Sequence, residues 1–150
     1  RRLGLANIDT RHCDATRPLE LDPAPPFDRL LLDVPCSGLG TLRRNPDLRW
    51  RVRPHDPAQL AQTQLALLRN AAPCLKPGGS LVYSTCTLLT EENDAVIDAF
   101  LAETNAFRRV PREALPAVVQ PLLDERGTLR CLPHLHDTDG FYAVRLERLR

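Results

Sequence analysis

Two cysteines in this sequence follow short apolar segments and are surrounded by small or polar residues. Cys36 lies in a Pro-Cys-Ser-Gly motif, just after an apolar run that ends at Asp33. Cys86 lies between two threonines, 50 residues further on, after a second short apolar run. The thiolate of cysteine is a strong nucleophile, so both side chains are candidates for covalent catalysis.

The elements that must position these thiols are predicted from apolar patterning. Continuous apolar runs predict buried strands at Phe27–Val34 and Ser80–Ser84, and a further strand is expected at Asn7–His12, before a Pro-rich stretch. Helical spacing of apolar residues predicts one helix from an Asp56 cap to the Pro-Gly-Gly turn at 77–79. A second helix is expected from a Thr90 cap to about Glu103, with acidic residues at its positive end.

The end of the chain has a different pattern. A short segment at Phe107–Val110 and a strand at Phe141–Leu146 follow one another with no long helix between them. Alternating strands and helices that end in this way predict a layered α/β fold with an antiparallel edge. Ligands of such sheets bind beyond the carboxyl ends of the strands. Asp14, Asp33, Cys36 and Cys86 all follow predicted strands, so we expect the two thiols to share one pocket.

Composition restricts the class of protein. The 150 residues are 43% hydrophobic and 26% charged, with a net charge of +1, as in an ordinary globular domain. No apolar run approaches the length of a membrane span, and five cysteines without a CxxC pair predict reduced thiols in a cytoplasmic protein. The sequence contains no Met, which favours a piece of a longer protein. Three cysteines, Cys13, Cys74 and Cys131, are interpreted as small hydrophobic residues.

Several blocks of this sequence resemble those of one enzyme family. They are Asp-Val-Pro-Cys-Ser-Gly at 33–38, Arg-Arg-Asn-Pro-Asp at 43–47 with Trp50, Leu-Lys-Pro-Gly-Gly at 75–79, Tyr-Ser-Thr-Cys-Thr at 83–87 and Asp-Gly-Phe-Tyr-Ala at 139–143. Together they are similar to the S-adenosylmethionine-dependent RNA cytosine-5 methyltransferases, particularly the bacterial Sun/Fmu type that acts on 16S rRNA. The Pro-Cys and Thr-Cys motifs, in this order and at this distance, are the specific part of the resemblance.

The resemblance implies a fold and a cofactor. The fold is a Rossmann-like class I methyltransferase sheet, truncated at its N-terminal side, with an antiparallel last strand. Residues 1–150 correspond to the C-terminal part of the catalytic domain, because the family's glycine-rich cofactor loop and first two strands lie upstream. The implied cofactor is S-adenosyl-L-methionine, and the implied partner is RNA, with rRNA as the expected substrate; no membrane or metal is implied.

The resemblance also implies roles for individual residues. Cys86 corresponds to the nucleophile that adds to carbon 6 of cytosine, and Cys36 to the residue that helps release the product. Asp33 would face both the base and the cofactor, whereas Asp14 would accept a hydrogen bond from the adenine amino group. We expect Lys or Arg side chains near Cys86 to lower the pKa of its thiol. The structural alternatives are a tight turn at Cys36 and capping roles for Asp33 and Asp14.

The segment Leu39–Pro54 has no clear periodicity and is predicted to be an exposed loop. Its basic residues surround an aromatic side chain, a combination that binds phosphates and stacks on unpaired bases. The candidate RNA-binding residues are Arg43, Arg44, Arg49 and Trp50. A solvated loop without a ligand is the alternative interpretation.

Three other hypotheses differ in class. A DNA cytosine-5 methyltransferase would use the Pro-Cys cysteine as its nucleophile, and the additional Thr-Cys motif disfavours it. An inactive fragment would retain both thiols without binding S-adenosylmethionine, because the glycine-rich loop is missing. A metal site built from His12, Cys13, His134 and His136 has no recognised ligand spacing, so no metal is predicted.

Overall fold

The protein folds around a mixed β-sheet, seen here in a computed structural model that describes residues 4–19 and 26–150. The strands of the described residues are β1 (Phe27–Asp33), β2 (Leu75–Thr85), β3 (Phe107–Arg109), β4 (Leu129–Cys131) and β5 (Phe141–Arg148). Their order is β1-β2-β5-β3, and β4 also pairs with β5. β1 and β2 are parallel, whereas β5 is antiparallel to β2. The predicted α/β fold with an antiparallel last strand is confirmed.

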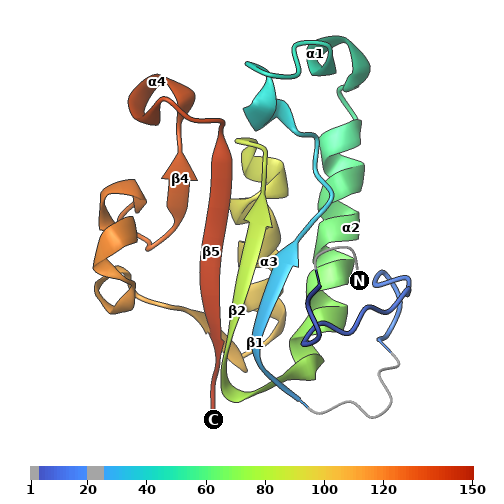
Figure 1. The fold of residues 1–150 in the computed structure, drawn as a ribbon, viewed down its shortest axis with the longest axis vertical. Coiled ribbons are helices and arrows are strands. Elements are labelled where there is room, and N and C mark those ends of the chain that lie inside the picture. The colour runs from blue at the N-terminus through green and yellow to red at the C-terminus, as the bar shows by residue number, and fades with distance from the viewer. Residues whose placement is uncertain (1–3, 20–25) are drawn as a thin grey trace.

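Two helices pack against each other on one face of this sheet (Figure 1). They are α2 (Asp56–Ala71) and α3 (Asp94–Glu103), each close to the range that the apolar spacing predicts. Two shorter helices, α1 (Leu48–Arg51) and α4 (Pro133–His136), lie beyond the ends of the strands (Figure 1). No helix in the described ranges is long and apolar enough to cross a membrane.

The hydrophobic core lies between the sheet and these two helices. Alternate residues of β2, Leu81 and Tyr83, are fully buried there, together with Val144 and Leu146 of β5. Tyr83 packs edge-on against another fully buried tyrosine of β5, with ring centroids 6.3 Å apart. This packing fixes the register of β2 against β5, because a shift of one residue would bring polar side chains into the core.

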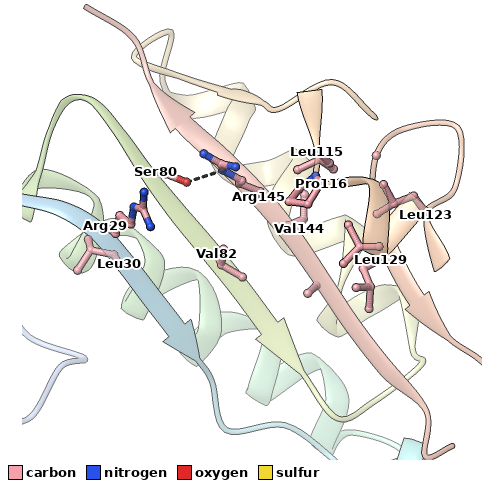
Figure 2. A pocket seen from close by; sticks show the side chains of 13 residues that line it. Arg29, Leu30, Ser80, Val82, Leu115, Pro116, Leu123, Leu129, Val144 and Arg145 are labelled. Carbon is pink, nitrogen blue, oxygen red and sulfur yellow. Dashed lines mark hydrogen bonds between the residues drawn. The ribbon is translucent and has the colours of Figure 1, made fainter. Parts of the chain in front are cut away.

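The opposite face of the sheet is more open. This face contains a depression of about 510 Å³. Figure 2 shows Arg29, Val82 and Arg145, from three adjacent strands, among the residues that line it. Arg145 donates a hydrogen bond from Nε to Ser80 Oγ at 2.7 Å across this surface. The lining of the depression contains neither Cys36 nor Cys86.

The strand predicted at Asn7–His12 is not formed. These residues are exposed, and none of them pairs with a strand of the described sheet. A strand needs a neighbour to satisfy its backbone N–H and C=O groups, and the apolar pattern alone does not indicate which segment would pair with it. Part of the Pro-rich stretch that follows, residues 20–25, lies outside the described residues.

Other boundaries also differ from the sequence prediction. The predicted loop Leu39–Pro54 contains a 3-10 turn at Leu39–Thr41 and the short helix α1. Asp56 is the first residue of α2, and its carboxylate accepts the Arg53 N–H at 2.8 Å instead of capping the helix. A 3-10 turn at Thr90–Glu92 precedes α3, so Thr90 does not cap that helix. The sequence pattern also missed β4, which has three residues.

The two closing strands form an antiparallel edge of the sheet, as the sequence predicts. β5 pairs with β2 on one side and with β3 and β4 on the other, and β3 is the outermost strand of the order β1-β2-β5-β3. Alternate residues of β5 are buried.

Candidate active site at the carboxyl ends of the parallel strands

The two thiol motifs meet at one edge of the sheet because β1 and β2 run in the same direction. Asp33, the last residue of β1, is in register with Ser84 near the end of β2. The chain therefore leaves both strands at the same level, and each cysteine follows within three residues. Cys36 Sγ lies 3.3 Å from Cys86 Sγ. The prediction that these thiols, 50 residues apart in sequence, share one site is confirmed.

Asp33 lies beside this pair at the end of β1. Ser84 Oγ donates a hydrogen bond to Asp33 Oδ1 at 2.8 Å, and the Val34 N–H donates to the Ser84 carbonyl at 3.1 Å. Asp33 itself is exposed. Its carboxylate is thus held in place by a neighbouring strand while keeping access to solvent and to a ligand at this edge.

The environment of Cys36 shifts the pKa of its thiol. Burial, followed by the hydrogen bond with Cys86, raises the pKa of Cys36 to about 12. Cys36 is therefore a neutral thiol at physiological pH and lies within hydrogen-bonding distance of Cys86 Sγ. Among the described residues, Cys36 is the residue whose side chain makes a hydrogen bond with the Cys86 sulfur. The Lys or Arg side chain that the sequence predicts near Cys86 makes no such hydrogen bond there.

A close backbone approach fixes the segment after Cys36 against the segment of Cys86. The Gly40 N–H donates to the Cys86 carbonyl at 3.0 Å, and the Gly140 N–H donates to the Gly40 carbonyl at 2.7 Å. A Cβ at Gly40 would lie 2.3 Å from the Gly140 carbonyl oxygen and 2.7 Å from that of Cys86. Glycine is required here, and the turn before β5 becomes part of the site.

Sequence reasoning missed three buried polar residues behind the thiols. Gln64, Glu92 and Asn93 are each 0% exposed, whereas the sequence only placed Glu92 at the positive end of a predicted helix. A signal was available for Gln64, which lies on the apolar face of α2 at helical spacing from Leu60 and Leu68. Glu92 and Asn93 follow β2 in a short turn, where no periodic pattern predicts burial.

Asp14 is not brought to this edge of the sheet. Its carboxylate accepts hydrogen bonds from Thr16 N and Oγ1, at 3.0 and 2.6 Å, which lower the pKa of Asp14. The next residue, Ala15, accepts a hydrogen bond from Asn70 at the end of α2 that lies farthest from the thiols (Figure 1). Because the strand predicted before Asp14 does not form, nothing carries this carboxylate to the strand ends.

The candidate RNA-binding segment lies beyond the same edge of the sheet as the thiols (Figure 1). Arg43 and Arg44 form ion pairs with Asp137 and Asp139, at 3.3 and 3.1 Å, from the turn before β5. Trp50 is 80% exposed, and the Arg49 guanidinium lies 5.1 Å from its ring centroid. In the described ranges no three His, Cys, Asp or Glu side chains gather as a metal site would require.

Comparison with known proteins assigns the chain to a family. Residues 1–147 match the family described as 16S rRNA methyltransferase RsmB/F. The chain belongs to this methyltransferase family, as the sequence motifs indicated.

Individual relatives give the extent of the match. The chain is 48% identical over 147 residues to the probable ribosomal RNA small subunit methyltransferase B of Synechocystis, covering 98% of the chain and 33% of the relative. Its fold is similar to the crystal structure of PH0851, with a TM-score of 0.86 and 39% identity over 98% of the chain and 32% of that structure. The structure of NSun6 from Pyrococcus horikoshii with SFG is also similar, with a TM-score of 0.71 and 28% identity. This match covers 99% of the chain and 36% of that structure. The chain spans about a third of the length of these relatives.

Proposed function

We propose that this chain carries the two-cysteine part of an enzyme that methylates carbon 5 of a cytosine in RNA, with 16S rRNA as the substrate. The observation that carries the proposal is the 3.3 Å separation of Cys36 Sγ and Cys86 Sγ at the carboxyl ends of two parallel strands. The family description and the names of the relatives support rRNA as the substrate class.

The reaction explains why two thiols are needed. Carbon 5 of cytosine is a weak nucleophile, so a thiolate first adds to carbon 6 and turns the ring into an enamine-like nucleophile. Carbon 5 would then form a bond to the methyl carbon as the bond from that carbon to its donor sulfur breaks, with the bonding electrons remaining on the sulfur. Loss of the carbon 5 proton to a base re-forms the ring double bond as the carbon–sulfur bond breaks, which returns the thiolate and yields 5-methylcytosine.

In this proposal Cys86 is the attacking thiol and Cys36 assists release of the product. The raised pKa of Cys36 supports this division, because a neutral thiol beside Cys86 can donate a hydrogen bond to the Cys86 sulfur as the carbon–sulfur bond breaks. Asp33, exposed and hydrogen-bonded by Ser84, would face ring nitrogen 3, where a shared proton favours addition at carbon 6.

S-adenosyl-L-methionine is the proposed methyl donor, and when bound it would supply an electrophilic methyl group. The relative solved with SFG, an S-adenosylmethionine analogue, supports this choice. The residues of this chain fit the cofactor in part. Asp33 lies at the correct edge of the sheet, but Asp14 is held beside the far end of α2, and the chain contains no glycine-rich loop after a strand.

We therefore expect these 150 residues alone to bind S-adenosylmethionine weakly. Losing a charge-assisted hydrogen bond to the ribose, together with the glycine-rich loop, weakens binding by at least about two orders of magnitude. Calorimetric titration of this polypeptide with S-adenosylmethionine measures the effect. Micromolar binding by a monomer of these residues would contradict the expectation.

The covalent test requires a version of the protein that also contains the family's upstream strands. Cys86→Ala is expected to abolish the protein–RNA adduct and lower turnover by more than about 10⁴-fold, because no other group adds to carbon 6. Cys36→Ala is expected to accumulate the adduct, because release is slowed after methyl transfer. Denaturing gel electrophoresis with labelled RNA measures both results.

The same pair of variants separates the alternatives. A stable adduct formed by Cys86→Ala would contradict the assignment of the nucleophile and favour the Pro-Cys cysteine, as in a DNA cytosine-5 methyltransferase. Cys74→Ala is a matched control, because Cys74 donates to the Asn70 carbonyl at the end of α2 and takes no part in the thiol pair.

A further inference from the structure

Three polar side chains form a buried layer directly behind the two thiols. Gln64 comes from the middle of α2, and Glu92 and Asn93 come from the turn between β2 and α3. Each is fully buried, and the turn is anchored by the Tyr83 hydroxyl, which donates to the Glu92 carbonyl at 2.7 Å. Adjacent residues of one turn therefore face the two cysteine loops, which are residues 35–37 and residues 85–87.

Two of these side chains hold the residues on either side of Cys36. The Ser37 N–H donates to Glu92 Oε2 at 2.8 Å, and Gln64 Nε2 donates to the Pro35 carbonyl at 2.9 Å. Gln64 Nε2 also donates to Glu92 Oε2, at 3.0 Å. The peptide groups before and after Cys36 are thus fixed by one connected network, which leaves the backbone at Cys36 little freedom to move.

The third side chain holds the residues on either side of Cys86. Thr85 Oγ1 donates to Asn93 Oδ1 at 2.6 Å, and Asn93 Nδ2 donates to the Thr87 carbonyl at 3.0 Å. A hydrogen bond from Ser37 Oγ to Thr87 Oγ1, at 2.9 Å, joins the two cysteine loops directly. Glu92 and Asn93, neighbours in sequence, therefore fix one cysteine loop each.

This layer is costly for stability. Glu92 Oε1 and Gln64 Oε1 are buried and have no hydrogen-bond partner in the described part of the protein. A buried oxygen without a partner destabilises the fold, and apolar residues of similar shape are often neutral or stabilising at such positions. Packing alone would favour an apolar side chain at position 64, on the apolar face of α2. The hydrogen bonds to the cysteine loops are what the polar side chains provide.

We propose that Gln64, Glu92 and Asn93 are positioning residues that set the separation of the Cys36 and Cys86 thiols. They do not contact the substrate in this proposal; they act through the backbone of the two cysteine loops. The consequence for turnover rests on the proposed function. The separation of the thiols is measurable without any activity, so the positioning role and the proposed function can fail independently.

The first test measures the thiol pair itself, in the 150-residue chain with Cys13, Cys74 and Cys131 replaced by Ala. In a glutathione buffer, glutathione disulfide and the two thiols exchange to give a Cys36–Cys86 disulfide and two molecules of glutathione. The equilibrium ratio gives the effective concentration of one thiol near the other. We expect Gln64→Leu, Glu92→Ala and Asn93→Leu to lower this effective concentration by about 10-fold to 100-fold.

Two matched variants control for charge and folding. Glu91→Gln changes the exposed neighbour of Glu92, and we expect it to leave the effective concentration unchanged. Glu92→Gln retains an oxygen that accepts from Ser37 and Gln64, so it should keep the effective concentration within about threefold. Gln64→Leu removes the oxygen without a partner together with the two hydrogen bonds from Nε2, so we expect it to remain folded and to unfold only a few degrees lower. A merely structural role would lower the effective concentration only in variants that lose their fold.

The second test uses the version with the upstream strands and RNA. Loosening the Cys36 loop by Gln64→Leu should slow release and accumulate the adduct, as Cys36→Ala does. Loosening the Cys86 loop by Asn93→Leu should instead slow adduct formation. If Cys36→Ala gives no adduct, the proposed function fails, and the glutathione result still decides the positioning role. Folded Gln64→Leu and Asn93→Leu variants with an unchanged effective concentration would overturn the proposal.

Discussion

The thiol site and the arginine segment, residues 43–50, lie beyond the same edge of the sheet but differ in how their side chains are held. Behind the thiols, fully buried side chains make short hydrogen bonds to the backbone on both sides of each cysteine. In the segment 43–50, the side chains of Arg43 and Arg44 are 44% and 73% exposed, and they pair with the exposed Asp137 and the mostly buried Asp139. The buried hydrogen bonds fix a single geometry at the thiol site, whereas the side chains of the arginine segment can exchange one ion-pair partner for another.

Energetics explain what this difference allows. Breaking a buried hydrogen bond and leaving its partner unpaired costs about 1–3 kcal/mol, whereas an exposed ion pair contributes about 0–1 kcal/mol. A phosphate can therefore replace the exposed Asp137 at Arg43 with little loss of stability. In the proposed function, the two thiols would keep their positions while the side chains of the arginine segment adapt to RNA.

The largest expected difference between the two regions concerns the titration of Cys36. Its pKa of about 12, raised from an ordinary value of 9.0 by burial and by the contact with Cys86, predicts about 10³-fold slower alkylation by iodoacetamide at about pH 8 than in the unfolded chain. Peptide mapping by mass spectrometry against pH measures this rate for Cys36 separately from the other thiols.

The same shift has a consequence for stability. Folding favours the protonated thiol, so the stabilisation is complete below about pH 9 and is lost as the pH rises from about 9 to about 12. Urea unfolding across this range measures it. Alkylation of Cys36 in the folded protein at the rate of the unfolded chain would show that the thiol pair is as accessible as the arginine segment.

A smaller effect is expected at the exposed aromatic residue of the arginine segment. Replacing Trp50 by Ala should weaken binding of a single-stranded RNA by about 10-fold to 100-fold, because a stacking surface for one base is removed. Trp50→Phe retains an aromatic face and is the control. Fluorescence titration of the version with upstream strands measures both affinities, and equal binding by Trp50→Ala would exclude stacking on this ring.

The smallest effects are expected for the paired arginines. Arg44→Ala should change the free energy of unfolding by less than about 1 kcal/mol, because its ion pair with Asp139 is largely exposed on the arginine side. Removing one arginine that binds a phosphate should lower the slope of log affinity against log salt by about 0.7 for a single strand. Unchanged salt dependence after replacing Arg43, Arg44 and Arg49 together would remove this segment from the RNA-binding surface.

Much of the fold could be predicted from local patterns. The apolar run before Asp33 forms β1, the spaced leucines after Asp56 form α2, and the final apolar segment forms an antiparallel strand. These elements bury apolar side chains at their own period, so the pattern contains the necessary information. The predicted strand Asn7–His12 failed because a strand also needs a partner, and no local pattern indicates whether the partner is present.

The sequence by itself determined that each of two cysteines follows a strand, because strand formation and motif position are local properties. That the two strands pair side by side in parallel was decided by the tertiary structure. The tertiary structure alone decided that Glu92 and Asn93 are buried and that Gly40 meets Gly140. It also decided that Arg44 has a carboxylate partner from the turn before β5. These facts depend on interactions between segments that are distant in sequence, and an interaction of this kind leaves no period or spacing in the chain.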